Sequence, residues 1–202
     1  MTEILKVPFN RSYWVVPAKL LAGGYPGSED PVEEERKLKG LIQAGIRHVI
    51  SLMEPQEYNR PHDPFPPYVD HMESIAQKLK ISGTFDQVSI KDFSVPTARQ
   101  MVRILNQIDM CIKYDKPVYV HCWGGKGRTG TDDCCYLIRH GIATGNNVIE
   151  MIKELRKNTE DFSEPSPETR EQIKMVISWK KIDESTENHL NKIFRSLSPD
   201  PG

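Results

Sequence analysis

The sequence predicts an α/β fold in which a central, mostly parallel twisted sheet is flanked by helices on both faces. Short apolar runs rich in β-branched residues recur along the 202-residue chain, at 46–53, 84–90 and 118–122. The segments between them repeat apolar residues every three or four positions, which is the period of an amphipathic helix. Strands that alternate with helices are typical of a parallel sheet with helical crossovers.

The N-terminal half supplies four of the expected strands and two of the helices. Gly45 ends the first helical pattern, and the five prolines of residues 54–67 favour a surface loop there. The expected elements are, in order, two short strands within 10–24, a helix over 32–44, a strand over 46–53, a helix over 68–81 and a strand over 84–90.

The C-terminal half begins with a loop at 91–97 and continues with helices around one strand. We expect helices over 98–114, 129–140 and 145–157, a strand over 118–122, and a last helix capped by Ser166 with Pro167 at its first position. The length favours one domain, assigned to 1–182. Residues 183–202 are polar and end in SLSPDPG, which predicts a peripheral helix and a loose C-terminal tail.

Composition narrows the class of protein. Hydrophobic residues make up 38 % and charged residues 27 %, as in soluble globular proteins, and the net charge of −1 argues against a nucleic-acid partner. No apolar run is long enough to span a membrane, and the N-terminus lacks a signal-peptide pattern. The four cysteines are expected to be reduced thiols in a cytoplasmic protein, and their spacing suggests neither a metal site nor a cofactor.

The segment HCWGGKGRTG, residues 121–130, has the chemistry of an oxyanion site. The preceding strand brings Cys122 to the carboxyl edge of the sheet, where ligands bind in such folds. Glycines let the following backbone curl so that its N–H groups face an anion, and Arg128 can hold two oxygens with its planar fork. The same positive field favours a thiolate at Cys122, which is a nucleophile for phosphorus. The expected phosphate-binding residues are Trp123, Gly124, Gly125, Lys126, Gly127 and Arg128.

This segment resembles the His-Cys-X5-Arg-Thr/Ser signature of the cysteine-dependent protein tyrosine phosphatases, and the flanking strand and helix are similar to the compact dual-specificity branch. The resemblance implies a protein tyrosine phosphatase-like fold and a phosphocysteine intermediate on Cys122. It implies that His121 fixes the loop and helps to keep the cysteine ionised. It further implies that Thr129 hydrogen-bonds the sulfur and that Gln172 orients the hydrolytic water.

A phosphatase of this kind also needs an acid for the leaving oxygen. Asp92 is the candidate, because it follows the strand over 84–90 on the expected sheet edge and precedes Cys122 by 30 residues. The segment DFSVP that it begins also resembles the acid loop of small dual-specificity phosphatases. The rival, Asp86, lies inside the strand pattern.

Two features of the signature raise questions about substrate and activity. Lys126 adds a cation that resembles those of lipid phosphatases, but it is interpreted as a rim charge, and Trp123 as part of the pocket wall. Asp132 and Asp133 follow the loop where an apolar helix is expected. If they are buried, they need a basic or amide partner and can raise the pKa of Cys122.

The sequence therefore predicts a phosphatase for phosphotyrosine, with tolerance of phosphoserine or phosphothreonine left open. The expected partner is a phosphorylated protein or a small phosphate ester. One alternative is the same chemistry on a phosphoinositide or a soluble inositol phosphate. A second alternative is a phosphate-binding module with little catalysis.

Overall fold

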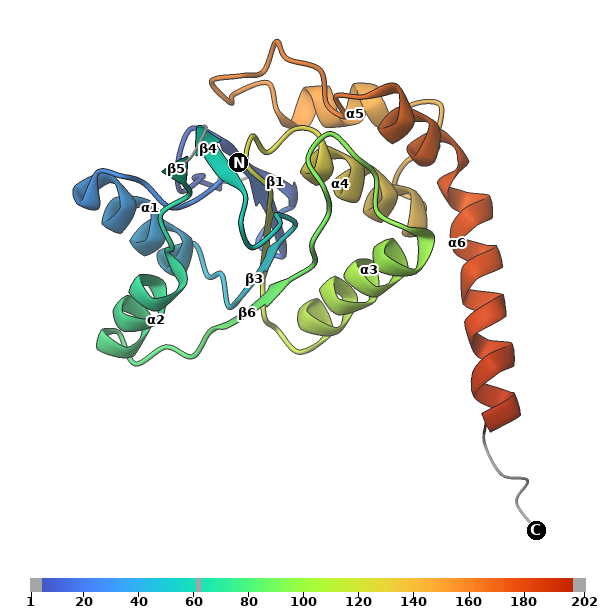
Figure 1. The fold of residues 1–202 in the computed structure, drawn as a ribbon, viewed down its shortest axis with the longest axis horizontal. Helices are drawn as coiled ribbons and strands as arrows, with labels where there is room; N and C mark the ends of the chain where they lie inside the picture. Colours follow the sequence, from blue (N-terminus) through green and yellow to red (C-terminus); the bar gives the residue numbers. More distant parts are fainter. Residues whose placement is uncertain (1–4, 61–62, 198–202) are drawn as a thin grey trace.

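The computed structural model describes residues 5–60 and 63–197, which form a five-stranded sheet between two layers of helices (Figure 1). The strand order is β1-β2-β7-β3-β6. Within this sheet β1 and β2 pair antiparallel, whereas β2–β7, β7–β3 and β3–β6 are parallel. The strands are β1 Ser12–Val16, β2 Leu20–Gly23, β3 His48–Ser51, β6 Thr84–Gln87 and β7 Val118–His121. The predicted α/β class is confirmed.

The helices cover both faces of the sheet. Helices α1 and α2 lie on one face, and α3, α4 and α6 on the other, with α5 at one end (Figure 1). Their bounds are α1 Pro31–Gln43, α2 Val69–Lys78, α3 Ala98–Lys113, α4 Arg128–Arg139, α5 Val148–Leu155 and α6 Arg170–Leu197. These bounds agree within a few residues with the periodic segments of the sequence, except in α6.

Each helical layer closes its own hydrophobic core. Leu38, Leu41 and Ile42 of α1 pack with Val49 and Tyr119 under one face of the sheet. The larger core on the opposite face joins the buried side chains of α3 and α4 to those of β7 and α6. The central strand β7 is buried along its whole length, because both layers cover it. The residue after β7 is therefore held between two packed layers.

Two segments differ from the sequence-based expectation. The proline-rich loop of residues 54–67 contains a small ribbon of two strands, β4 Tyr58–Arg60 and β5 Asp63–Pro64. Ser166 does not cap the last helix, because its hydroxyl donates instead to the carbonyl of Lys126 at 2.9 Å. Helix α6 begins at Arg170, where the Thr169 hydroxyl accepts the N–H of Gln172 at 3.2 Å. A tertiary contact thus moves the helix start by several residues.

Helix α6 continues far beyond the body of the molecule (Figure 1). It runs unbroken through most of the segment expected to form a peripheral helix and tail, and residues 198–202 lie outside the described part. Among the described residues, no helix is long and apolar enough to cross a membrane.

Candidate active site

The loop of residues 122–128, called here the cysteine loop, joins the end of β7 to the start of α4. Cys122 is only 3 % exposed. Gly125 has a φ of +72°, and a Cβ there would lie 2.5 Å from backbone atoms of Gly23 and Gly24. Only glycine fits this position, because both the conformation and the space exclude a side chain. The loop therefore curls tightly against β2, in front of the positive end of helix α4.

Arg128, the first residue of α4, has a buried guanidinium in a network of acceptors. Its Nη1 and Nη2 donate to the two carboxylate oxygens of Glu57 at 2.6 and 2.7 Å, and Nη1 also donates to the carbonyl of Ile90 at 3.0 Å. Burial alone would lower the pKa of Arg128, but the Glu57 hydrogen bonds raise it well above its ordinary value. The Nε atom is buried without a partner among the described residues. An incoming oxyanion would satisfy this orphaned donor.

Asp92 lies in the loop after β6 and reaches the same arginine. One carboxylate oxygen is 3.0 Å from Nη2 of Arg128, and it also accepts the N–H of Phe93 at 3.0 Å. The side chain remains 35 % exposed, so the carboxylate is accessible from the solvent side of the loop. The rival Asp86 lies within β6 and contacts Gln107 and His48 instead. The structure thus brings Asp92, and not Asp86, to the cysteine loop.

His121 is fully buried behind the loop, among aromatic rings. Its Nε2 lies 2.7 Å from the Tyr68 hydroxyl, and its Nδ1 lies 3.2 Å from the carbonyl of Cys122. Burial lowers the pKa of His121 to about 4, and the Cys122 carbonyl offsets only part of that effect. The imidazole is therefore neutral near pH 7. It affects Cys122 through its contact with the Cys122 carbonyl and through the shape of the loop, and it adds no positive charge beside the thiol.

Thr129 and Gln172 also lie beside the cysteine loop. The Thr129 hydroxyl donates a long hydrogen bond of 3.5 Å to the carbonyl of Gly23. Gln172 is fully buried, and its Nε2 donates to the carbonyl of Ser94 in the Asp92 loop at 3.1 Å. A Cβ on Gly127 would lie 3.1 Å from that same Nε2. Gln172 thus contacts both the cysteine loop and the Asp92 loop.

The two unusual side chains of the loop, Lys126 and Trp123, face different surroundings. The Lys126 amine is paired with Glu164 at 3.1 Å and Glu168 at 3.6 Å. Its charge is therefore compensated within the chain. Trp123 is 38 % exposed and meets the ring of Phe65 edge-on, with 6.0 Å between ring centroids.

Asp132 and Asp133 are fully buried in helix α4. Asp133 accepts a hydrogen bond from the Tyr13 hydroxyl at 2.5 Å, and burial raises its pKa to about 7. Neither oxygen of Asp132 has a hydrogen-bond partner among the described residues, and burial raises its pKa well above the ordinary range. Burial without a partner therefore favours the neutral, protonated form of Asp132 over the carboxylate. This limits the negative potential that the pair adds near Cys122.

Sequence reasoning missed three residues that complete the site. Glu57 comes from the proline-rich loop, Tyr68 from the residue before α2, and Arg11 from the segment before β1, where its Nη2 donates to the carbonyl of Gly124 at 3.1 Å. No local pattern marks them, because each is far from Cys122 in sequence.

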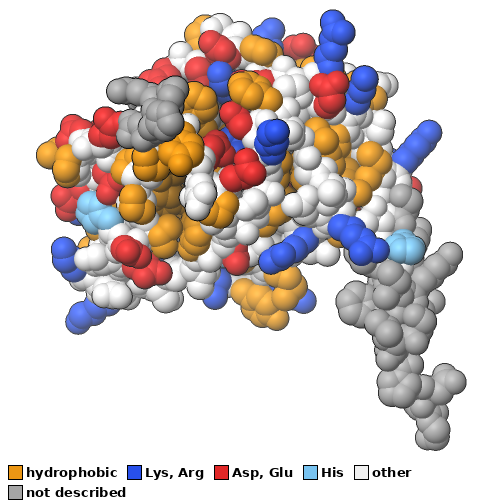
Figure 2. Space-filling model, viewed as in Figure 1, with side chains coloured by type: hydrophobic (Ala, Val, Ile, Leu, Met, Phe, Trp, Pro, Cys, Tyr) orange, Lys and Arg blue, Asp and Glu red, His pale blue; other side chains and the backbone are white. Residues whose placement is uncertain are grey.

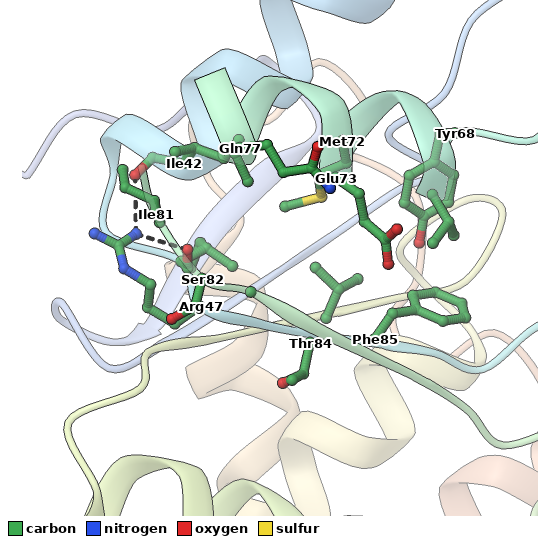
Figure 3. Close-up of a pocket in the computed structure, with 15 residues that line it drawn as sticks. Ile42, Arg47, Tyr68, Met72, Glu73, Gln77, Ile81, Ser82, Thr84 and Phe85 are labelled. Atoms are coloured by element: carbon green, nitrogen blue, oxygen red, sulfur yellow. Dashed lines mark hydrogen bonds between the residues drawn. The ribbon is translucent and has the colours of Figure 1, made fainter. Parts of the chain in front are cut away.

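Cavities lie on several sides of the site, and one of about 190 Å³ is lined by Glu57, Pro64 and Phe65. A larger one, of about 330 Å³, lies between α2 and β6, away from the cysteine loop (Figure 3). Tyr68 lines it at one end, and its hydroxyl contacts His121. A smaller polar cavity of about 270 Å³ is lined by Arg11, Lys37 and Trp123 and adjoins the cysteine loop. Within the described ranges, no cluster of three or more potential ligand side chains suits a metal ion.

Comparisons with known proteins agree on one family. The model of the family described as PTP-SAK, Swiss Army Knife protein, DSP-PTPase phosphatase domain, matches residues 9–181. An uncharacterized protein of Methanocaldococcus jannaschii is 35 % identical over 95 residues, which cover 47 % of this chain and 54 % of that relative.

Solved structures show the same fold. The active form of Tk-PTP superposes with a TM-score of 0.59 at 23 % identity, over 86 % of this chain and 97 % of that one. The structure of PTPMT1 in complex with PI(5)P gives a TM-score of 0.61 at 18 % identity, over 87 % of this chain and 98 % of that one. The expected protein tyrosine phosphatase-like architecture is thereby confirmed.

Proposed function

The chain belongs to the DSP-PTPase phosphatase family, and we propose that it hydrolyses phosphotyrosine through a phosphocysteine intermediate on Cys122. The observation that carries the proposal is the environment of Arg128. Its Nε is buried and unpartnered beside a loop whose backbone curls at Gly125, at the N-terminal end of a helix. A phosphoryl group would supply the missing acceptor and neutralise the local positive field.

In the proposed first step, the Cys122 thiolate attacks phosphorus, and the bond to the leaving oxygen breaks. Arg128 and the loop N–H groups stabilise the charge on the equatorial oxygens. Asp92, in its acid form, gives its proton to the leaving oxygen. The 3.0 Å contact between Asp92 and Arg128 supports this role, because it holds the carboxyl beside the group that would bind the phosphoryl oxygens.

In the proposed second step, water attacks the phosphorus of the phosphocysteine, and Asp92 takes a proton from the water. The P–S bond breaks, which releases inorganic phosphate and restores the Cys122 thiolate. The contacts of Gln172 with the Asp92 loop support a role in orienting that water. Thr129 would hydrogen-bond the departing sulfur after turning away from the Gly23 carbonyl, which it contacts at 3.5 Å. His121, tied to Tyr68, would hold the shape of the loop. Together, the two steps return the enzyme to its starting protonation state, because Asp92 regains in the second step the proton that it gives in the first.

Single-turnover kinetics test this proposal. A phosphotyrosine peptide mixed with excess protein should release the dephosphorylated peptide and inorganic phosphate, with an acid-stable phosphoenzyme trapped early on Cys122. Cys122→Ser should bind the peptide without release, and Cys134→Ser, at a buried thiol of helix α4, serves as the matched control. Unchanged release by Cys122→Ser would exclude this mechanism.

A phosphoinositide or inositol phosphate is the second candidate substrate. The fold likeness to PTPMT1 bound to PI(5)P favours it. The pairing of Lys126 with Glu164 and Glu168 opposes it, because that loop cation is already compensated. Comparing kcat/KM for phosphotyrosine peptides and inositol phosphates separates the two candidates. Binding of both without turnover would instead indicate a phosphate-binding module.

The proposed chemistry also suits a reducing, cytoplasmic location. The four cysteines are free, and a thiolate nucleophile is lost when it is oxidised.

A further inference from the structure

A second cationic pocket lies directly beside the cysteine loop. This cavity of about 270 Å³ shares Trp123 with the loop and continues to Arg11, in the segment before β1, and Lys37, on α1. Phe65 and Tyr25 form an aromatic wall together with Trp123. We call it the Arg11 pocket. Because Arg11 bonds the carbonyl of Gly124, an anion held there would lie next to a phosphoryl group in the cysteine loop.

Arg11 has donors that the chain does not fully satisfy. Its Nε is buried without a hydrogen-bond partner among the described residues. The carboxylates of Glu160 and Asp161 lie 3.7 and 4.0 Å from this atom, beyond hydrogen-bond distance, and Asp161 is already bound to Arg156 at 3.0 Å. A buried guanidinium N–H without an acceptor is costly, and an anionic ligand would remove that cost.

Lys37 is the second incompletely paired cation. In the part of the chain that the structure describes, its amine has no ion pair, only a long contact of 3.4 Å with the carbonyl of Gly27 and the ring of Phe9 at 5.7 Å. The nearby Glu33 is held by Arg36 at 2.7 Å. Burial lowers the pKa of Lys37, the carboxylate of Glu33 opposes part of that effect, and the charge of Arg11 lowers the pKa further. Both cations therefore favour an incoming negative charge.

We propose that the Arg11 pocket binds the carboxylate of an acidic residue close to the phosphotyrosine of a peptide substrate. The inference rests on the proposed phosphotyrosine activity and names the substrate class. The aromatic wall suits a peptide. The exposed Glu29 in the pocket lining, and the Glu164–Lys126–Glu168 cluster across the loop, would repel a ligand with many charges. The surroundings thus favour a ligand that carries one negative charge besides its phosphotyrosine over a ligand that carries several phosphates.

Binding to the Cys122→Ser protein tests the pocket separately from turnover. Phosphotyrosine peptides carry a single Asp or Asn at each of three positions on either side of the phosphotyrosine, and affinities are measured by calorimetry. We expect one position at which Asp binds about three- to tenfold more tightly than Asn, as for a partly buried ion pair. Adding Lys37→Gln should bring that ratio close to one, and Lys37→Arg should restore it.

Lys39→Gln is the matched control, because Lys39 lies on the same helix, is exposed and pairs with Glu35 at 2.7 Å. It should keep the full Asp/Asn ratio. The inference is overturned if no position prefers Asp, if no peptide binds, if the preference survives Lys37→Gln, or if an inositol bisphosphate binds more tightly than every acidic peptide. An Asp preference together with no turnover by the wild-type chain would reject the proposed hydrolysis and leave the pocket assignment intact.

Discussion

At the scale of single residues, Arg128 shows how one side chain is prepared for an anion. Glu57 holds both terminal nitrogens, and the Ile90 carbonyl accepts a second bond from Nη1. These contacts fix the guanidinium plane before any ligand arrives and leave Nε free for it. Preorganised donors of this kind do not have to reorganise when charge develops during the reaction.

Asp92→Asn tests the proposed acid. We expect kcat for a phosphotyrosine peptide to fall about 10²-fold or more, because the tyrosine oxygen would leave without a proton. The loss should be smaller with p-nitrophenyl phosphate, whose leaving group is a weaker base. Asp86→Asn, at the rival position in β6, is the control and should change kcat little. Equal losses with both substrates, or none, would reject the assignment.

The raised pKa of Asp133 predicts that the free energy of unfolding depends on pH in an unusual way. Its folded-state pKa, raised to about 7, lies above the unfolded value near 4, so the folded chain binds an extra proton between these limits. The free energy of unfolding should therefore fall as pH rises, by roughly 2–3 kcal/mol between pH 5 and 7.5. Urea unfolding at both pH values measures this change.

Asp133→Asn removes the contribution of this group and should make the dependence on pH shallower, while the buried Asp132, whose pKa is also raised, still contributes in the same direction. Asp70→Asn, at an exposed position in the first turn of α2, is the control and should leave the slope as in the wild type. An identical slope in wild type and Asp133→Asn would mean that Asp133 does not titrate in this range.

At the scale of elements, the helices begin where side chains replace missing backbone partners. Thr97 and Gln100 form a capping box at the start of α3, with the Thr97 hydroxyl accepting the N–H of Gln100 at 3.2 Å. The side chain of Gln100 accepts the N–H of Thr97 at 2.9 Å in return. This box also ends the loop that holds Asp92, so the helix start fixes the end of a functional loop.

Thr97→Ala should lower the free energy of unfolding by about 1 kcal/mol, because the N–H of Gln100 loses the hydroxyl that accepts it. Thr97→Ser keeps the hydroxyl and should lose much less. Urea unfolding of the three proteins at one pH gives the comparison. A loss in Thr97→Ser as large as that in Thr97→Ala would show that the methyl group, and not the cap, stabilises the helix.

At the scale of the whole molecule, charge is mixed and the first part of the long last helix packs on the body. Figure 2 shows acidic, basic and hydrophobic side chains interspersed on the visible face, which agrees with a near-neutral chain. Asp183 is buried and accepts the Nε–H of Arg139 at 2.8 Å. We therefore propose that the phosphatase domain extends slightly beyond residue 182.

Truncation tests this boundary. A chain ending at 182 loses Asp183 and leaves Arg139 without its buried carboxylate, so it should unfold at least about 1 kcal/mol more easily than the full chain. A chain ending at 189 keeps Asp183 and Glu187, both partners of Arg139, and should match the full chain. Equal thermal stability of the two truncated chains would place the boundary at 182.

Much of the fold and the centre of the site follow from local sequence. Alternating strand and helix patterns predict the α/β class, and residues 121–130 bring the proposed nucleophile, a glycine-rich turn and an arginine into one continuous segment. The glycines give that segment the conformational freedom to curl, so the residue types mark the site before its distant partners are known. Local sequence was not sufficient at Ser166. Its position predicts a helix cap, but its hydroxyl donates to the cysteine loop instead.

Tertiary structure decided which groups surround that segment. Glu57 is 71 residues from Arg128 in sequence, Tyr68 is 53 from His121, and Arg11 is 113 from Gly124. The pairing of Lys126 and the burial of Asp132 and Asp133 likewise depend on how distant segments pack. The sequence by itself determined the reactive atoms, whereas packing determined their charges and neighbours, because desolvation and ion pairing exist only once the chain has folded.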